Sequence, residues 1–290
     1  MRPRYSFSSR RTGHLKNIRK QRKKFPSITE KILEEADIIV EVLDARFIHE
    51  TKNPEIEQAI KSKNKKIIYV LNKSDLINEE NIKEFSEKSV LVSCKDRTGI
   101  SELRNIIKII ASQIKKINKA SGFKFKGPKA KSNIDQVVIG VLGYPNTGKS
   151  SLINVLIGRN SAATSSQSGY TKSIQKLKLM EGIVLLDSPG VIPKKEYSSI
   201  ESVKIAKHAK IGSRTYSNVK NPEQVITEIM REYPELFEKY YKIKAKGNSE
   251  TLLEELGGKK NFLKKKGVID TDKTSRFVLK EWQEGKIRID

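Results

Sequence analysis

Residues 137–150 read Val-Val-Ile-Gly-Val-Leu-Gly-Tyr-Pro-Asn-Thr-Gly-Lys-Ser. Residues 137–142 form a nearly continuous apolar run, which is typical of a buried strand. Gly143 to Ser150 match the pattern G-x-x-x-x-G-K-[ST], whose glycines let successive backbone N–H groups point at phosphate oxygens. A helix that begins near Lys149 adds the positive end of its dipole. The stretch therefore predicts a phosphate-binding loop between a strand and a helix.

The residue types in this loop suggest a division of roles. Lys149 is expected to reach the β- and γ-phosphates of a nucleotide, and the Ser150 hydroxyl to be a ligand of Mg²⁺. The residues predicted to contact the phosphates are Asn146, Thr147, Gly148, Lys149, Ser150 and Ser151.

A D-x-x-G element, Asp187 to Gly190, follows an apolar run at 183–186 that we interpret as another buried strand. An acidic residue at the carboxyl end of a strand beside the phosphate loop can hold Mg²⁺ through water, and the Gly190 N–H can meet a γ-phosphate. Taken alone, D-x-x-G is a common turn sequence. Beside a phosphate loop, it makes Asp187 a candidate metal ligand and Gly190 a candidate catalytic residue.

Asn72-Lys73-Ser74-Asp75 follows the predicted strand at 67–71 and forms an N-K-x-D element. The Asp75 carboxylate can accept from the N1–H and N2–H of guanine at once, whereas adenine offers neither donor. Sites of this kind reject analogues that leave a buried polar group unpaired by roughly 10⁴-fold. The alternative is a polar turn after a strand. With the phosphate loop present, guanine recognition by Asn72, Lys73 and Asp75 is the favoured reading.

Ser93-Cys94-Lys95 follows a third predicted strand at 90–92. This segment can cap the base with backbone N–H groups and with the packed stem of Lys95. We expect Cys94 to be a small packing residue there rather than a reactive thiol.

The remaining pattern predicts an α/β protein with a mostly parallel sheet and helices on both faces. A further strand is expected at 38–43. Residues 100–117 place one set of apolar side chains on one face at helical spacing: Ile100, Leu103, Ile106, Ile107, Ile110, Ile114 and Ile117. The base-reading elements precede the phosphate loop and D-x-x-G, which is the reverse of a Ras-type chain. The prediction is therefore a circularly permuted P-loop GTPase fold, in which a basic linker at 119–133 joins ends that are free in a Ras-type domain.

Three domains are expected. Residues 1–25 carry many basic and no acidic side chains and predict a flexible arm. The GTPase domain spans 26–198. Residues 199–290 predict a small all-α domain, with helix starts at Asn221, Pro234 and Asp272. The lysines expected to form its basic patch are Lys259, Lys260, Lys264, Lys265 and Lys266.

The charge balance points to a polyanionic partner. The chain has 58 Lys+Arg against 34 Asp+Glu in 290 residues, a formal charge of +24. Such a surface binds phosphate backbones by releasing counterions, so RNA is the first partner to consider. An anionic membrane ranks well below RNA, because the most basic segment lacks an apolar helix face. The alternative for any single basic patch is that its lysines serve solubility and bind no polyanion.

Composition also excludes several classes of protein. A single cysteine and three histidines without zinc-site spacing exclude a disulfide scaffold and a zinc finger. No apolar run approaches the roughly 18 to 20 residues of a membrane span, and no signal core follows the basic N-terminus. We expect a folded, cytoplasmic monomer without a membrane partner.

The motif order resembles the circularly permuted GTPases of the YlqF (RbgA) and YawG type, which act in ribosomal subunit assembly. The resemblance runs from about Glu30 to the C-terminus. Besides the four motifs, it includes the elements Asp44-Ala45-Arg46, Gly169-Tyr170-Thr171, Tyr233-Pro234-Glu235-Leu236 and the stretch from Asp272 to Lys286. It implies that Thr171 is the switch threonine that completes the Mg²⁺ shell. By composition alone, any Ser or Thr from Ser161 to Thr171 could serve.

Two features bear on catalysis. Val191 follows Gly190 where Ras-type proteins carry a glutamine, and a valine side chain cannot orient water by hydrogen bonding. Hydrolysis is thus expected to be slow alone or helped by another group, such as one from the ribosomal particle. Asn146 occupies the position where related GTPases hold a potassium ion. Its alternative role is to stabilise the turn after Pro145.

The sequence therefore predicts a GTP- and Mg²⁺-dependent switch that binds ribosomal RNA and the precursor of a ribosomal subunit, with the large subunit favoured. One alternative is an RNA-binding scaffold or chaperone with vestigial nucleotide binding. Another is an ATP-using P-loop kinase, which would need an acceptor site and no N-K-x-D element.

Overall fold

The computed structural model describes residues 28–77, 89–120, 136–158, 174–193 and 202–289. Several sequence predictions lie outside these residues: the basic arm at 1–25, the linker beyond Ala120, the Gly169–Thr171 element with the predicted switch residue Thr171, and the domain boundary at 198. The start of the predicted linker, Lys119 and Ala120, forms the end of a helix.

The centre of the molecule is a six-stranded sheet in the order β3-β2-β1-β4-β6-β5. Its strands are β1 (Ile38–Asp44), β2 (Lys66–Asn72), β3 (Ser89–Val92), β4 (Val137–Leu142), β5 (Gln175–Met180) and β6 (Ile183–Asp187). All neighbouring pairs are parallel except β5 with β6. The predicted mostly parallel α/β fold is confirmed, and every predicted strand is present.

The edge strand β5 was not predicted. Its sequence, Gln-Lys-Leu-Lys-Leu-Met, alternates between polar and apolar side chains, unlike the continuous apolar runs of the inner strands. Leu177 and Leu179 pack against the core, whereas Lys176 and Lys178 are exposed. Alternation is the pattern of a strand with one solvated face.

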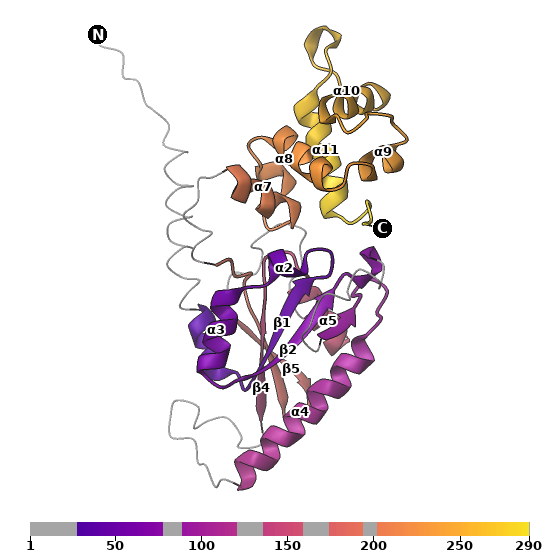
Figure 1. Ribbon diagram of the computed structural model, residues 1–290. Helices are drawn as coiled ribbons and strands as arrows, with labels where there is room; N and C mark the ends of the chain where they lie inside the picture. The colour runs from indigo at the N-terminus through magenta and orange to yellow at the C-terminus, as the bar shows by residue number, and fades with distance from the viewer. Residues whose placement is uncertain (1–27, 78–88, 121–135, 159–173, 194–201, 290) are drawn as a thin grey trace, which may run out of the picture.

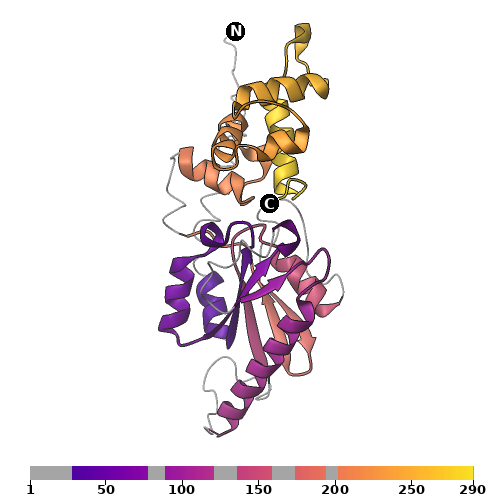
Figure 2. The same ribbon diagram turned by 45° about the vertical axis from the view of Figure 1, so that its right-hand side comes forward.

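Helices cover both faces of the sheet (Figures 1 and 2). The long helix α4 (Ile100–Ala120) and the phosphate-loop helix α5 (Lys149–Ile157) share one hydrophobic cluster with the inner strands. The helical residues 28–35 and α3 (Pro54–Ser62) form a second cluster with the sheet. The short helix α2 (Ile48–Thr51) follows β1 at the edge where the parallel strands end. We call this unit, residues 28–193 as described, the sheet part.

Residues 202–289 form the helical part. Its α-helices are α7 (Ser202–Lys210), α8 (Pro222–Glu232), α9 (Leu236–Tyr241), α10 (Ser249–Lys259) and α11 (Thr271–Gln283), and its 3-10 turns include η3 (Tyr216–Asn218) and η4 (Lys265–Gly267). The helix starts expected at Asn221, Pro234 and Asp272 fall within two residues of α8, α9 and α11. The helix α10, capped by the Asn248 side chain, was not singled out from the sequence.

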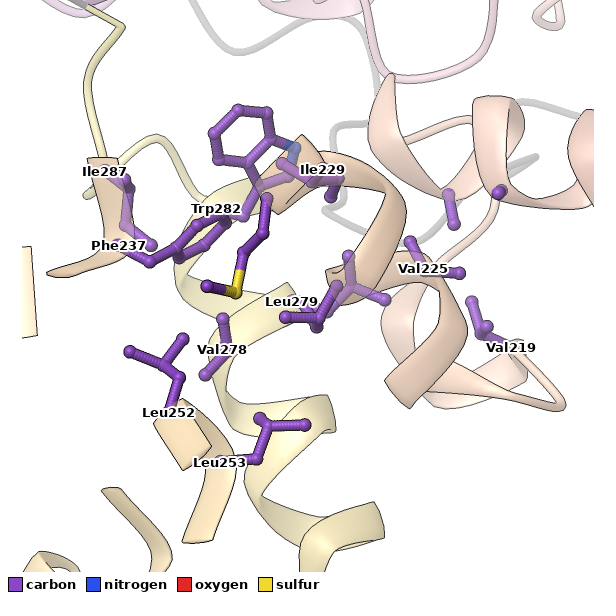
Figure 3. Close-up of a cluster of buried hydrophobic side chains, with 14 of the residues drawn as sticks. Val219, Val225, Ile229, Phe237, Leu252, Leu253, Val278, Leu279, Trp282 and Ile287 are labelled. Atoms are coloured by element: carbon purple, nitrogen blue, oxygen red, sulfur yellow. The ribbon is translucent and has the colours of Figure 1, made fainter. Parts of the chain in front are cut away.

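Trp282 of α11 is fully buried in the hydrophobic cluster of the helical part, where Figure 3 shows it near Phe237 and Ile229. Its ring lies 5.7 Å from Phe237 and 5.8 Å from Phe47, measured between centroids. Phe47 and Tyr144 belong to the sheet part, yet both are buried in this same cluster. The hydrophobic core of the helical part is thus continuous with residues at the carboxyl end of the sheet, which holds the two parts against each other.

In the part of the chain that the structure describes, no helix is both long and apolar enough to cross a lipid bilayer.

Candidate functional site

The predicted motifs all follow parallel strands whose carboxyl ends lie at one edge of the sheet. Ligands of open α/β sheets bind at this edge, outside the carboxyl ends of the strands. The N-K-x-D element follows β2, Ser93 to Lys95 follow β3, the phosphate loop follows β4, and Asp187 ends β6. The helical part lies over the same edge (Figure 1).

A cavity of about 610 Å³ opens between the helical part and the motifs that follow β2, β3 and β4, whereas Asp187 to Gly190 do not line it. Its volume is within the range of about 300 to 1,000 Å³ that is usual for small-molecule sites. From the sheet part it is lined by the predicted residues Asn72, Lys73, Asp75, Cys94, Lys95, Asn146, Gly148 and Ser151, together with Leu76. Residues far apart in the sequence therefore share one cavity.

Asp75 lies in the 3-10 turn η1 (Ser74–Leu76). The residue that precedes this turn, Lys73, has a left-handed backbone conformation. Asp75 Oδ1 accepts a hydrogen bond of 2.8 Å from Ser93 Oγ, which in turn accepts from the backbone N–H of Asp96. The hydroxyl of Ser93 thus fixes the rotamer of the carboxylate that sequence reasoning assigned to guanine.

Asn72 joins three motifs. Its Nδ2 donates to the Thr147 carbonyl at 2.7 Å, and its Oδ1 accepts from the Cys94 N–H at 3.3 Å. A Cβ on Gly148, whose φ is 94°, would lie 2.1 Å from Asn72 Nδ2. Only glycine fits this position, because the phosphate loop and the side chain of Asn72 approach so closely.

Cys94 is half-buried beside this contact. Burial, aided by the negative charge of Asp75, raises the pKa of its thiol to about 12. The thiol is therefore protonated at neutral pH, which agrees with the packing role expected from the sequence.

Lys149 begins α5 and is buried. Its Nζ donates to the Tyr144 carbonyl at 2.6 Å. Burial lowers the pKa of the ammonium to about 8, although the charge of Asp187 opposes this shift. A negatively charged phosphate close to Lys149 would raise the pKa again, because opposite charges favour the ionised form.

Ser150 and Asp187 form the best-placed pair for a divalent cation. Ser150 Oγ donates to Asp187 Oδ2 at 3.0 Å, whereas the buried Asp187 Oδ1 has no hydrogen-bond partner among the described atoms. Burial raises the pKa of Asp187, opposed by the hydrogen bond from Ser150 and the charge of Lys149. A hydroxyl and an unpaired carboxylate oxygen fit Mg²⁺, which prefers oxygen ligands and retains several waters. The third predicted ligand, Thr171, lies outside the described residues.

The D-x-x-G element rests on the phosphate loop. A Cβ on Gly190 would lie 2.5 Å from the backbone of Pro145, and the Val191 N–H donates to the Gly143 carbonyl at 3.0 Å. The Val191 side chain is buried in the core beneath the loop. It is therefore unable to orient a water molecule, as the sequence predicted.

Asp44 and Arg46 were noted in the sequence only as part of the family resemblance, without a role. The structure places the buried Asp44 carboxylate between two cations: Arg46 Nη2 at 2.8 Å and Lys73 Nζ at 2.7 Å. Burial alone would raise the pKa of Asp44, but the charges of Arg46 and Lys73 outweigh it and hold the pKa well below the ordinary value. Lys73 lines the cavity with its ammonium directed to Asp44 rather than to other lining groups.

Arg46 connects this cluster to the helical part, because its Nη1 donates to the Trp282 carbonyl at 3.1 Å. Asn146 makes a second connection. Its Nδ2 donates to the Gly212 carbonyl at 2.7 Å.

The side of the cavity opposite the motifs is formed by Gly212, Tyr216, Lys280, Gln283 and Glu284 of the helical part. Sequence reasoning missed all five. They belong to no phosphate- or base-binding motif, and only the folding of the helical part over the sheet brings them to the cavity.

Comparisons with known proteins agree with this geometry. A family model described as "50S ribosome-binding GTPase" matches residues 138–246. The match begins at the strand before the phosphate loop and leaves the base-reading elements upstream of it, as a permuted motif order requires.

Relatives similar over most of the chain come from all three domains of life. The chain is 35% identical over 275 residues to an uncharacterized GTP-binding protein of Methanocaldococcus jannaschii. This alignment covers 91% of this chain and 67% of the relative. The chain is 29% identical over 289 residues to ribosome biogenesis GTPase A of Bacillus cereus, and the alignment covers 95% of this chain and 90% of that relative. It is 31% identical over 260 residues to nucleolar GTP-binding protein 2 of Neurospora crassa, of which it spans only 40%.

Among solved structures, the GNP-bound YlqF from T. maritima matches with a TM-score of 0.58 and 22% identity, and 89% of this chain and 93% of that chain are covered. The GDP-bound YlqF structure matches equally well. These likenesses support the fold.

Proposed function

This chain belongs to the circularly permuted GTPases that include YlqF and ribosome biogenesis GTPase A, and we propose that it is a GTP-hydrolysing switch that assists assembly of a ribosomal subunit. The observation that carries the proposal is the shared cavity: Asp75 and the phosphate-loop residues Asn146, Gly148 and Ser151 line one space of about 610 Å³. A carboxylate suited to guanine and a loop suited to phosphates therefore line the same cavity, so one guanine nucleotide could contact both.

Within this proposal the motif residues keep their predicted roles, except that Asn72 positions the phosphate loop instead of reading the base. Asp75 accepts from the guanine edge, Asn72 holds the loop against the base pocket, and Ser93, Cys94 and Lys95 cap the base. Lys149 binds the β- and γ-phosphates, which replace the Tyr144 carbonyl as partners of its ammonium. Gly190 packs against Pro145 of the phosphate loop, and its backbone N–H would donate to the γ-phosphate.

We propose that Ser150 and Asp187 hold Mg²⁺, with Thr171 as the third protein group. The cation would supply positive charge that offsets the charge developing on the transferred phosphoryl group. We also propose that a potassium ion binds beside Asn146. The amide oxygen would be the ligand atom, because the amide nitrogen is a hydrogen-bond donor and donates to Gly212.

Hydrolysis by the protein alone is expected to be slow, because the buried Val191 side chain offers no group to orient the attacking water. We propose that the bound ribosomal particle supplies or orders the missing group. This arrangement would couple hydrolysis to completion of the binding step.

The partner we propose is ribosomal RNA in a subunit precursor, with the large subunit favoured by the family model's description. Exposed lysines at the end of α10 and around η4 provide a cationic surface at the far side of the helical part from the sheet: Lys259, Lys260, Lys264, Lys265 and Lys266. Leu263 and Val268 of the same segment are 46% and 62% exposed. Lysines bind phosphates without reading sequence, and exposed apolar side chains can pack on unpaired bases. A monomer acting in the cytoplasm is part of this proposal.

The switch itself follows from the contacts of the phosphate loop. Tyr144 is buried in the helical core, and Asn146 donates to Gly212. A change in the loop on phosphate binding or release would therefore reach the helical part directly. We propose that GTP fixes the orientation that grips RNA and that hydrolysis releases it.

Co-sedimentation with separated ribosomal subunits tests this function. The protein is compared with a non-hydrolysable GTP analogue, with GDP and without nucleotide, alongside Lys149→Ala and the matched surface variant Lys178→Ala. The expected result is strong association of wild type and Lys178→Ala in the GTP-analogue state only. Lys149→Ala should lose the nucleotide dependence and keep basal RNA binding.

An RNA-binding scaffold with vestigial nucleotide binding is the alternative function. It predicts that wild type and Lys149→Ala sediment equally in all nucleotide states. That outcome would replace the switch by the scaffold.

A further inference from the structure

The nucleotide cavity has a second wall that no motif accounts for. Tyr216 lies in η3, whereas Lys280, Gln283 and Glu284 lie at the end of α11. All belong to the helical part, and they face the base-reading and phosphate-loop residues across the cavity. A ligand that fills a cavity lined by both parts must contact both of them.

Tyr216 is held firmly at this wall. Its backbone N–H donates to Gln283 Oε1 at 3.0 Å, and its carbonyl accepts from Arg276 Nη1 at 3.0 Å. Gln283 is fixed in turn, because its Nε2 donates to the carbonyls of Ala209 and Arg214 at 2.8 Å each. A residue whose backbone is ordered before binding loses little entropy when a ligand packs on it.

The end of α11 is also fixed relative to the base-reading motif. Lys73 pairs with Asp44, Asp44 with Arg46, and Arg46 Nη1 donates to the Trp282 carbonyl, one residue before Gln283. The indole N–H of Trp282 donates to the Lys210 carbonyl at 2.8 Å. These hydrogen bonds set the distance across the cavity between Asp75 and the wall formed by Tyr216 and Lys280.

We propose that the guanine nucleotide is bound between the two parts and that Tyr216 and Lys280 of the helical part contact it directly. The proposal rests on the proposed function and deepens it, since it assigns nucleotide-binding residues outside the GTPase motifs. The Tyr216 ring provides an apolar, polarisable surface for the guanosine moiety. The Lys280 ammonium provides positive charge toward the phosphates.

The charges around Lys280 fit this role. Its ammonium lies 3.8 Å from Glu284, whose carboxylate also lies 3.2 Å from Lys286 Nζ. Because Glu284 is shared with Lys286, an anionic nucleotide does not leave it without a cationic partner when Lys280 moves to the phosphates. The Glu284 carboxylate also lines the cavity and can accept from a ribose hydroxyl, as acidic residues do in dinucleotide sites.

A nucleotide held in this way is itself an interdomain contact. GDP as well as GTP would fasten the helical part to the sheet part through guanosine, and only release of the nucleotide would remove this link. The γ-phosphate would then act on the orientation of the helical part through the phosphate loop, while the guanosine moiety would set whether the two parts stay together.

The test is a titration of the full-length protein with a fluorescent GDP analogue. Tyr216→Ala is expected to weaken binding about tenfold, comparable with loss of a base-stacking aromatic residue, and Lys280→Ala by a few fold. The matched controls are Tyr240→Ala and Lys239→Ala, two residues of α9 outside the cavity whose side chains are exposed. Both controls should bind within twofold of wild type. Binding within twofold of wild type by both Tyr216→Ala and Lys280→Ala would overturn the proposal.

Hydrogen exchange of the wild-type protein provides a second test that does not depend on a variant folding. GDP should slow exchange in residues 214–218 and at the end of α11 more than in α10. Unchanged exchange in these segments, with GDP bound, would also overturn the proposal. If the wild type binds no guanine nucleotide at all, the proposed function fails with it, whereas tight guanine binding without these effects rejects only the contact from the helical part.

Discussion

The side-chain amide of Asn146 donates a hydrogen bond of 2.7 Å to the carbonyl oxygen of Gly212, which joins the phosphate loop to the helical part. The neighbouring Tyr144 reinforces the connection, because its ring is buried in the helical core while its carbonyl accepts from Lys149. The loop that we propose for phosphate binding is therefore also a structural element of the interface between the two parts. Movement of either one is expected to move the other.

Asn146→Ala should loosen this connection. Loss of the hydrogen bond to Gly212 is expected to cost about 1 kcal/mol of local stability. Amide exchange at residues 211–213 should accelerate about fivefold, which is that free energy expressed as a rate ratio. Asn105→Ala, on the exposed face of α4, is the matched control and should leave these amides unchanged. Equal exchange in both variants would show that the hydrogen bond carries no coupling.

Gly190→Ala should separate nucleotide binding from hydrolysis. The added Cβ would lie 2.5 Å from the Pro145 backbone, so the D-x-x-G element must move away from the phosphate loop. Because the proposed γ-phosphate contact of the Gly190 N–H is lost, GTP turnover in the presence of ribosomal particles should fall at least tenfold. GDP affinity should stay within about threefold, since the base pocket and Lys149 are unchanged. Parallel loss of GDP binding and turnover would contradict the assignment of this contact to the γ-phosphate.

Asp44→Asn should destabilise the protein strongly. The substitution keeps the side-chain shape and leaves Arg46, which is 2% exposed, and Lys73 without their counter-charge. Breaking a buried ion pair in this way costs about 3–5 kcal/mol. Urea unfolding measures the effect. Asp272→Asn, which breaks a partly exposed pair with Arg276, should cost less than about 1 kcal/mol.

The lowered pKa of Asp44 also predicts how the difference in unfolding free energy between wild type and Asp44→Asn changes with pH. The pKa of Asp44 is lowered in the folded protein, so the unfolded chain binds the proton first as the pH falls. The stability contribution is therefore fully present above about pH 4, the unfolded value, and is lost below it. The gap between wild type and Asp44→Asn should be constant above about pH 5 and should narrow below about pH 4. A gap that widened on acidification would mean that the carboxyl is not held ionised by its neighbours.

Lys149 should make nucleotide affinity pH-dependent. Its pKa of about 8 in the nucleotide-free protein means that binding a polyanion above this pH requires uptake of a proton. GDP affinity is expected to fall up to about eightfold between pH 7.5 and 9, which follows from the protonated fraction of a group with that pKa. Lys149→Arg is the control, because its guanidinium keeps its charge over this range. Equal pH profiles for wild type and Lys149→Arg would rule out Lys149 as the titrating group.

Much of the fold and of the motif geometry was predictable from the sequence, for identifiable physical reasons. The inner strands of a parallel sheet are buried on both faces, so they appear as continuous apolar runs. The motifs were predictable because their glycines and polar residues directly follow these strands. The edge strand β5 was missed because it has one solvated face and no flanking motif.

The rest of the site depends on contacts that have no local signature. Asn72 was predicted to read the base, yet its side-chain hydrogen bonds tie the phosphate loop to Cys94. Tyr216 and Lys280 come to the cavity only because Trp282 docks α11 on Arg46 at the sheet. No spacing in the sequence encodes a contact between residues 46 and 282, since it arises where the hydrophobic core of the helical part meets residues at the carboxyl end of the sheet.

The most direct test of the central claim is a competition experiment in which GDP, ADP and XDP displace a fluorescent guanine nucleotide from the wild type and from Asp75→Asn. Xanthine carries a carbonyl where guanine carries the N2 amino group, so an amide in place of the carboxylate should match xanthine better. We predict that the wild type prefers GDP over ADP by at least about 10³-fold and that Asp75→Asn loses GDP and gains XDP. Equal displacement by GDP and ADP from the wild type, or an unchanged preference in Asp75→Asn, would contradict the assignment of this cavity to a guanine nucleotide.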